Sequence, residues 1–144
     1  MRRLVAPIVG GMAAVGALVW YMSEGEAPPK RAGDLAVPSG QALSVLDTVQ
    51  AVPGPEGLTV RFRFLAPEIA RSGGTIDAET AQTDMAWLCE NYALPRVPEQ
   101  GPEVQQVIIS LADRAVEFGA ADPEATQFFE AYDVTEGTCI WEAF

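Results

Sequence analysis

A strict alternation of apolar and polar side chains over residues 58–65 constrains the fold of this chain more than any other feature. The segment LTVRFRFL has an apolar residue at every second position: Leu58, Val60, Phe62 and Phe64. Thr59, Arg61 and Arg63 fill the positions between them. Successive side chains of a β-strand point to opposite faces, so this period of two predicts a half-buried strand. The sheet that contains it needs a second layer over its apolar face.

Other segments are typical of strands and tight turns. The predicted strands lie at residues 43–52, 104–111, 116–118, 127–134 and 138–144. The turn sequence PGPEG at 53–57 predicts a hairpin between residues 43–52 and 58–65. Residues 135–137 predict a second hairpin near the C-terminus, and Val107 lies in a run that is apolar on both faces, as in a central strand.

One helix is predicted between the second and third strands. Asp77 is a suitable N-cap residue, and the apolar residues that follow fall on one helical stripe: Ala78, Ala81, Met85, Leu88, Cys89 and Tyr92. Pro95 cannot continue a helix, so we expect it to end near Ala93 or Leu94. The predicted class is α+β, with one amphipathic helix packed on a mostly antiparallel sheet.

The N-terminal residues 1–22 indicate where in the cell the protein is located. Arg2 and Arg3 precede a run from Leu4 to Met22 that has no charged residue. As a helix this run would span about 28 Å, close to the hydrocarbon thickness of a bilayer. It predicts a membrane anchor with the N-terminus in the cytoplasm, because the arginines stay on that side. A cleaved signal segment is the alternative.

This N-terminal run divides the chain into three parts. Residues 23–33, SEGEAPPKRAG, lack apolar periodicity and predict a short tether. Residues 34–144 then form the exported α+β domain. We expect an inner-membrane protein whose domain is periplasmic, attached through residues 4–22; the alternative is release into the periplasm after signal cleavage.

The chain has two cysteines, Cys89 in the predicted helix and Cys139 in the last predicted strand. Behind an export segment, an even number of cysteines favours a disulfide, which would fasten the helix to the C-terminal edge of the sheet. Two buried free thiols are an alternative. A redox-active pair is disfavoured, because the close C-x-x-C spacing that lowers a thiol pKa is absent.

Charge and composition argue against several classes of function. With 20 acidic and 9 basic residues the formal net charge is −11, which disfavours nucleic acid as a partner. The chain has no histidine, the commonest general base and transition-metal ligand. A serine nucleophile would then need a lysine, and the only lysine, Lys30, lies in the predicted tether. We therefore expect no enzyme active site, metal or cofactor.

Two sets of acidic residues offer weaker alternatives. Glu117 and Glu130 lie in neighbouring predicted strands and could form the carboxylate pair of a glycoside hydrolase, although many other pairs could too. Glu130, Asp133 and Glu136 could hold a cation weakly. A solvated polar face is the favoured interpretation of this second set.

The candidate interaction face comprises Arg61, Arg63, Phe128, Phe129 and Trp141. The two arginines share one strand face and could bind carboxylates of a partner, although cross-strand ion pairs with glutamates are the favoured interpretation. Consecutive strand residues point in opposite directions, so Phe128 and Phe129 cannot both lie in the same core. One of them should be exposed or covered by another element or a partner.

Five blocks of the sequence carry a family resemblance: VPSGQ (37–41), GLTVRFRFLAPEIARSGGTID (57–77), DMAWLCENYALPR (84–96), QVIISLADRAVEFG (106–119) and EATQFFEAYDVTEGTCIWEAF (124–144). Together they resemble a family of small exported proteins of unknown function from photosynthetic and marine alphaproteobacteria of the Rhodobacter type. The resemblance implies an envelope location and a shared fold, with both cysteines inside the blocks. Some members bear the automated label acetolactate synthase, which these residues do not support, because the G-D-G motif of thiamine diphosphate enzymes is absent.

Together these observations predict a membrane-tethered periplasmic module without a catalytic site, which acts through a protein partner in the cell envelope. A periplasmic protein that binds a small ligand or a cation is the alternative. An enzyme that uses paired carboxylates is less favoured.

Overall fold

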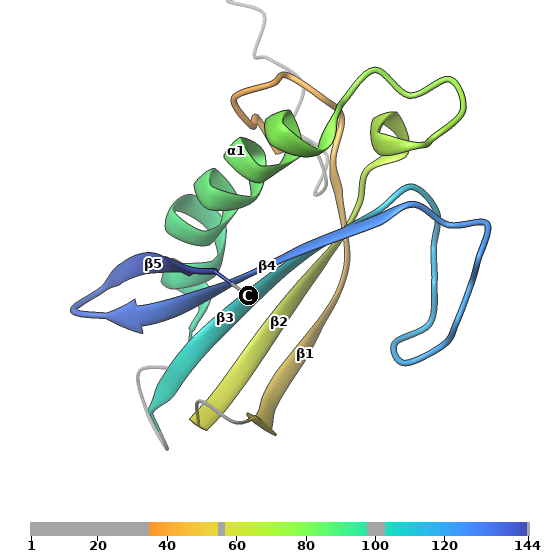
Figure 1. Cartoon of the computed structure of the whole chain (residues 1–144). Coiled ribbons are helices and arrows are strands. Elements are labelled where there is room, and N and C mark those ends of the chain that lie inside the picture. The colour runs from red at the N-terminus through yellow and green to blue at the C-terminus, as the bar shows by residue number, and fades with distance from the viewer. Residues whose placement is uncertain (1–34, 55–56, 98–102, 144) are drawn as a thin grey trace, which may run out of the picture.

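Five strands form one sheet in the order in which they occur along the chain (Figure 1). The computed structural model describes residues 35–54, 57–97 and 103–143. The strands are β1 (Ser44–Gly54), β2 (Gly57–Leu65), β3 (Val104–Ala112), β4 (Gln127–Thr135) and β5 (Thr138–Glu142). The predicted anchor at 1–22 and tether at 23–33 lie outside the described residues. No helix within the described ranges is long and apolar enough to cross a membrane.

The sheet is mixed, with one parallel pair. β1 with β2, β3 with β4, and β4 with β5 are antiparallel, whereas β2 and β3 are parallel. A parallel pair needs a long crossover connection, and the helix α1 (Ala78–Leu88) lies in that connection. The predicted α+β class and the mostly antiparallel sheet are confirmed.

α1 begins where the sequence predicts. The carboxylate of Asp77 accepts a hydrogen bond of 2.8 Å from the amide of Thr80, which caps the first turn. The helix continues as a π-helical turn over Cys89–Ala93 and a 3₁₀ turn over Leu94–Arg96, which contains Pro95. A further 3₁₀ turn, Pro67–Ile69, follows β2.

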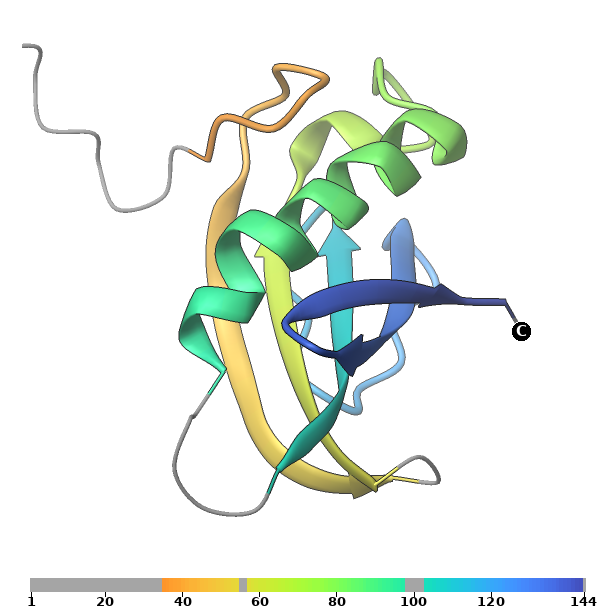
Figure 2. The ribbon, with the colours of Figure 1, turned by 90° about the vertical axis from the view of Figure 1, so that its left-hand side faces the viewer.

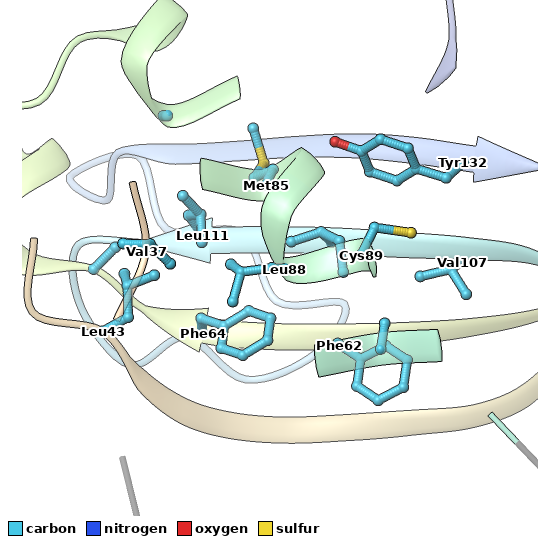
Figure 3. Close-up of a cluster of buried hydrophobic side chains, with 14 of the residues drawn as sticks. Val37, Leu43, Phe62, Phe64, Met85, Leu88, Cys89, Val107, Leu111 and Tyr132 are labelled. Carbon is cyan, nitrogen blue, oxygen red and sulfur yellow. The ribbon is translucent and has the colours of Figure 1, made fainter. Parts of the chain in front are cut away.

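The core lies between α1 and the sheet face that it crosses (Figure 2). The alternation in β2 has the predicted effect, because Val60, Phe62 and Phe64 are all buried. They pack with other buried side chains from α1 and β3 (Figure 3): Met85, Leu88, Val107, Ile109 and Leu111. The ring of Tyr92 meets those of Phe62 and Phe64 edge-on, with centroids 5.9 and 5.3 Å apart.

The prediction of a short strand at residues 116–118 is wrong. Residues 113–126 form a loop between β3 and β4. β3 already pairs with β2 on one side and β4 on the other, so no edge beside it is left for this segment. The loop instead folds against the sheet face away from α1, where the carbonyl of Val116 accepts a hydrogen bond from Arg63.

A buried carboxylate joins the segment before β1 to α1. Asp84 is fully buried and accepts three hydrogen bonds. They come from the amide and the hydroxyl of Ser39, at 2.9 and 2.5 Å, and from the side-chain amide of Gln41, at 2.6 Å. Hydrogen bonds to a charged group are stronger than those between neutral groups. Asp84 therefore fixes where the chain enters the domain.

We predict that Asp84→Ala lowers the free energy of unfolding by about 3 kcal/mol, because donors of Ser39 and Gln41 lose their acceptor. Urea denaturation of the full chain in a non-ionic detergent measures this. Glu79→Ala, at an exposed position of the same helix, serves as the control and should change the value by less than about 1 kcal/mol. Equal urea midpoints for Asp84→Ala and the wild type would contradict the assigned role.

Candidate functional site

The sheet face away from α1 holds an ionic pair that fixes the loop 113–126. Arg63 alternates with the core residues of β2 and is itself 6% exposed. Its guanidinium lies 2.7 Å from the carboxylate of Asp47, the residue directly opposite on β1. It also donates to the carbonyl of Val116. The favoured interpretation, a cross-strand ion pair, is confirmed for Arg63, with an aspartate in place of the expected glutamate.

Arg61 lies on the same face in a different environment. It is half-buried, and its Nη1 donates to the hydroxyl of Ser110 on β3 at 2.9 Å. Its Cζ lies 5.6 Å from the ring centroid of Phe118 and 5.9 Å from that of Phe129. None of the carboxylates in the described ranges forms a salt bridge with it. Burial lowers the pKa of Arg61, and the charge of Arg63 lowers it further.

We call Arg61, Ser110, Phe118 and Phe129 the arginine–aromatic cluster. Phe118 and Phe129 are exposed residues, at 55% and 56%. Phe129 is the neighbour of Phe128 that points away from the core, whereas Phe128 packs against the core. The prediction that these two residues face opposite ways is confirmed. Phe118 is a member that sequence reasoning missed, because only the path of the loop brings it beside Arg61.

The predicted interaction face is thus split between the two sides of the sheet. Arg61, Arg63 and Phe129 lie on the face away from α1, whereas Phe128 and Trp141 lie on the side of α1. Trp141 pairs with Tyr132 across the β4–β5 hairpin. These residues therefore belong to two separate surfaces.

On the helix side, a disulfide fastens the hairpin to the helix. Cys89, at the end of α1, is bonded to Cys139 on β5, with their Cα atoms 6.3 Å apart. This confirms the predicted disulfide over the two free thiols. The amide of Cys139 also donates to the carboxylate of Glu90 at 2.9 Å. The position of β5 relative to α1 is therefore set by a covalent bond and a hydrogen bond.

A pocket of about 290 Å³ lies between α1, β4 and β5. We call it the α1–β5 pocket, and its lining residues are Gln82, Thr83, Ala86, Glu130, Tyr132 and Trp141. Glu130 is 8% exposed. Its two carboxylate oxygens accept one hydrogen bond each, from the side-chain amide of Gln82 at 2.9 Å and from the indole N–H of Trp141 at 2.5 Å.

Tyr132 also lines this pocket and is 2% exposed. Burial raises the pKa of its phenol well above the ordinary value, and the charge of Glu130 raises that pKa further. The phenol is therefore neutral at physiological pH. No hydrogen bond to its hydroxyl is found within the described ranges, and Figure 3 shows this hydroxyl on the side of Met85.

The structure separates the acidic residues that the sequence could have paired. Glu117 lies exposed in the loop beside the arginine–aromatic cluster, whereas Glu130 faces α1 on the other side of the sheet. They therefore cannot act together on one substrate. Within the described ranges, no group of three or more acidic or cysteine side chains could hold a metal ion. Both surfaces offer groups suited to binding: a guanidinium between rings, and a buried carboxylate beside rings.

Comparison with known proteins gives one family. Residues 17–144 match a family described as Family of unknown function (DUF6497), and the chain belongs to this family. This agrees with the expected family of unknown function. No curated protein and no solved structure matches the chain.

We predict that replacing both cysteines, Cys89→Ala with Cys139→Ala, lowers the free energy of unfolding. The disulfide closes a loop with a sequence separation of 50, and its removal restores about 4 kcal/mol of chain entropy to the unfolded state. Urea denaturation with and without reductant measures the loss. The reductant should weaken the wild type and leave the double variant unchanged. An unchanged free energy of unfolding for the fully reduced wild type would contradict this prediction.

Proposed function

We propose that this DUF6497 family member is a non-enzymatic interaction module tethered to the inner membrane, with its domain in the periplasm. In this proposal the arginine–aromatic cluster binds a protein partner in the cell envelope. The tether and the location rest on the sequence of residues 1–33, the two arginines and the uncharged run above all. The observation that supports the binding role most directly is the environment of Arg61.

Arg61 has the character of a binding residue. It uses one N–H group on Ser110, and the rest of its planar fork matches the geometry of a carboxylate. The burial and the like charge that lower its pKa also make an added negative charge beside it favourable. The exposed rings of Phe118 and Phe129 provide apolar area next to the charge. Arginine and aromatic residues dominate the energetics of many protein interfaces.

The charge of the whole chain limits the kind of partner. A formal net charge of −11 repels a strongly acidic surface at long range. A single carboxylate within an otherwise apolar segment avoids this repulsion and still pairs with Arg61. We therefore propose a partner that places one Asp, Glu or C-terminal carboxylate on Arg61 and apolar side chains over Phe118 and Phe129.

We predict that Arg61→Gln reduces recovery of the partner at least about tenfold, as expected for loss of a central charged contact. The test is a pull-down of the tagged full chain from membranes in mild detergent, with the partner quantified by mass spectrometry. Arg114→Gln is the matched control, because Arg114 is an exposed arginine in the same loop as Phe118 and pairs only with its neighbour Asp113 among the described residues. It should leave recovery unchanged.

Two results would overturn this proposal. One is a chain that is recovered without a stoichiometric partner; the other is a partner that Arg61→Gln retains in full. The intact mass of the same bait tests the tether, since an anchored chain keeps residues 1–22 and a cleaved one begins beyond Met22. An intact mass that lacks residues 1–22 would show that this segment is cleaved. The domain would then be released into the periplasm and not tethered to the membrane.

A further inference from the structure

We propose that the α1–β5 pocket binds a small organic cation with an alkylated ammonium group, held by the carboxylate of Glu130 and the rings of Trp141 and Tyr132. This site is independent of the arginine–aromatic cluster, because the sheet separates the two. The proposal goes beyond the interaction role and would stand if that role were wrong.

The first step of the argument is the charge of Glu130. Of the described residues that line the pocket, Glu130 alone is charged, and none of the described arginines forms a salt bridge with it. Its oxygens accept hydrogen bonds from two neutral donors, Gln82 and Trp141. Burial of a carboxylate is costly unless a positive charge compensates it. A cation in the adjacent pocket would supply that compensation.

The second step is the aromatic lining. Ring faces of tryptophan and tyrosine attract cations, and tryptophan does so most strongly. The hydrogen bond from its indole N–H to Glu130 fixes the Trp141 ring at the pocket. Trp141 is 56% exposed as a residue, so a ligand in the pocket could cover part of it. Burial is the larger cause of the raised pKa of Tyr132 and the charge of Glu130 the smaller one; that negative charge also favours a cation beside the ring.

The third step concerns which cation fits. The volume of about 290 Å³ lies just below the usual range for small-molecule sites, about 300–1,000 Å³, so the ligand is small. A primary ammonium group has three N–H donors that all require acceptors. Each Glu130 oxygen already accepts one hydrogen bond, and Ala86 and the two ring faces offer no acceptor, so the further acceptors would have to come from Gln82 and Thr83. An alkylated ammonium group needs no acceptor and matches this lining.

Isothermal titration of the full chain, in a non-ionic detergent, with choline tests the proposal. The matched control ligand is 3,3-dimethyl-1-butanol, which has the shape of choline with a neutral carbon in place of the nitrogen. We expect choline to bind one-to-one and the neutral alcohol to bind at least about tenfold more weakly. This comparison uses only the wild-type chain and does not depend on any variant folding.

Variants then locate the site. Glu130→Gln and Trp141→Leu should each weaken choline binding about tenfold, whereas Arg61→Gln on the opposite face should leave the dissociation constant unchanged. Equal affinity for choline and the neutral alcohol would overturn the proposal, as would no binding of choline at about 10 mM. Unchanged choline binding by a folded Glu130→Gln chain would do the same. The pull-down with Arg61→Gln tests the arginine–aromatic cluster, and the choline titration tests the α1–β5 pocket. Failure of one proposal therefore does not count against the other.

Discussion

The parallel pairing of β2 with β3 is the constraint on which the rest of the structure depends. Two parallel neighbours cannot be joined by a tight turn, so the chain must cross the sheet between them. It crosses as α1, and the apolar side chains of β2 and β3 turn toward that helix. Among the described residues, the opposite face is covered by no helix and holds Arg61, Arg63 and the loop 113–126. One pairing thus determines that the domain has two unlike surfaces.

Those two surfaces hold complementary charges that cannot meet. Arg61 has no salt bridge to a carboxylate, and Glu130 none to a cation, among the described residues. On one surface they would pair and neutralise each other. Because Arg61 and Glu130 face opposite sides of the sheet, each retains a charge that an external group can satisfy. This arrangement is the physical basis of the two binding proposals made above.

Local features of the sequence predict much of this fold. The alternation over residues 58–65 gives both the strand and its buried face, Asp77 marks the start of α1, and two cysteines give the disulfide. The predictions that fail are those that depend on contacts between residues far apart in the sequence. A period of two does not say whether a neighbour runs parallel, and the residues 116–118 have strand-like composition but no sheet edge beside β3. The α1–β5 pocket was missed because Gln82, Glu130 and Trp141 meet only after a helix, a crossover and a hairpin are in place.

The bonds of Asp84 have a mechanical consequence. β1 is an edge strand, and an edge strand pulled from its first residue can peel away one hydrogen bond at a time. Tension on the N-terminal side of the domain is resisted first by Leu35 and Val37, which pack in the core, and then by Asp84 through Ser39 and Gln41. That load passes into α1 and, through Cys89, into β5. The segment before β1 therefore shields β1 from force applied to the N-terminal side of the domain.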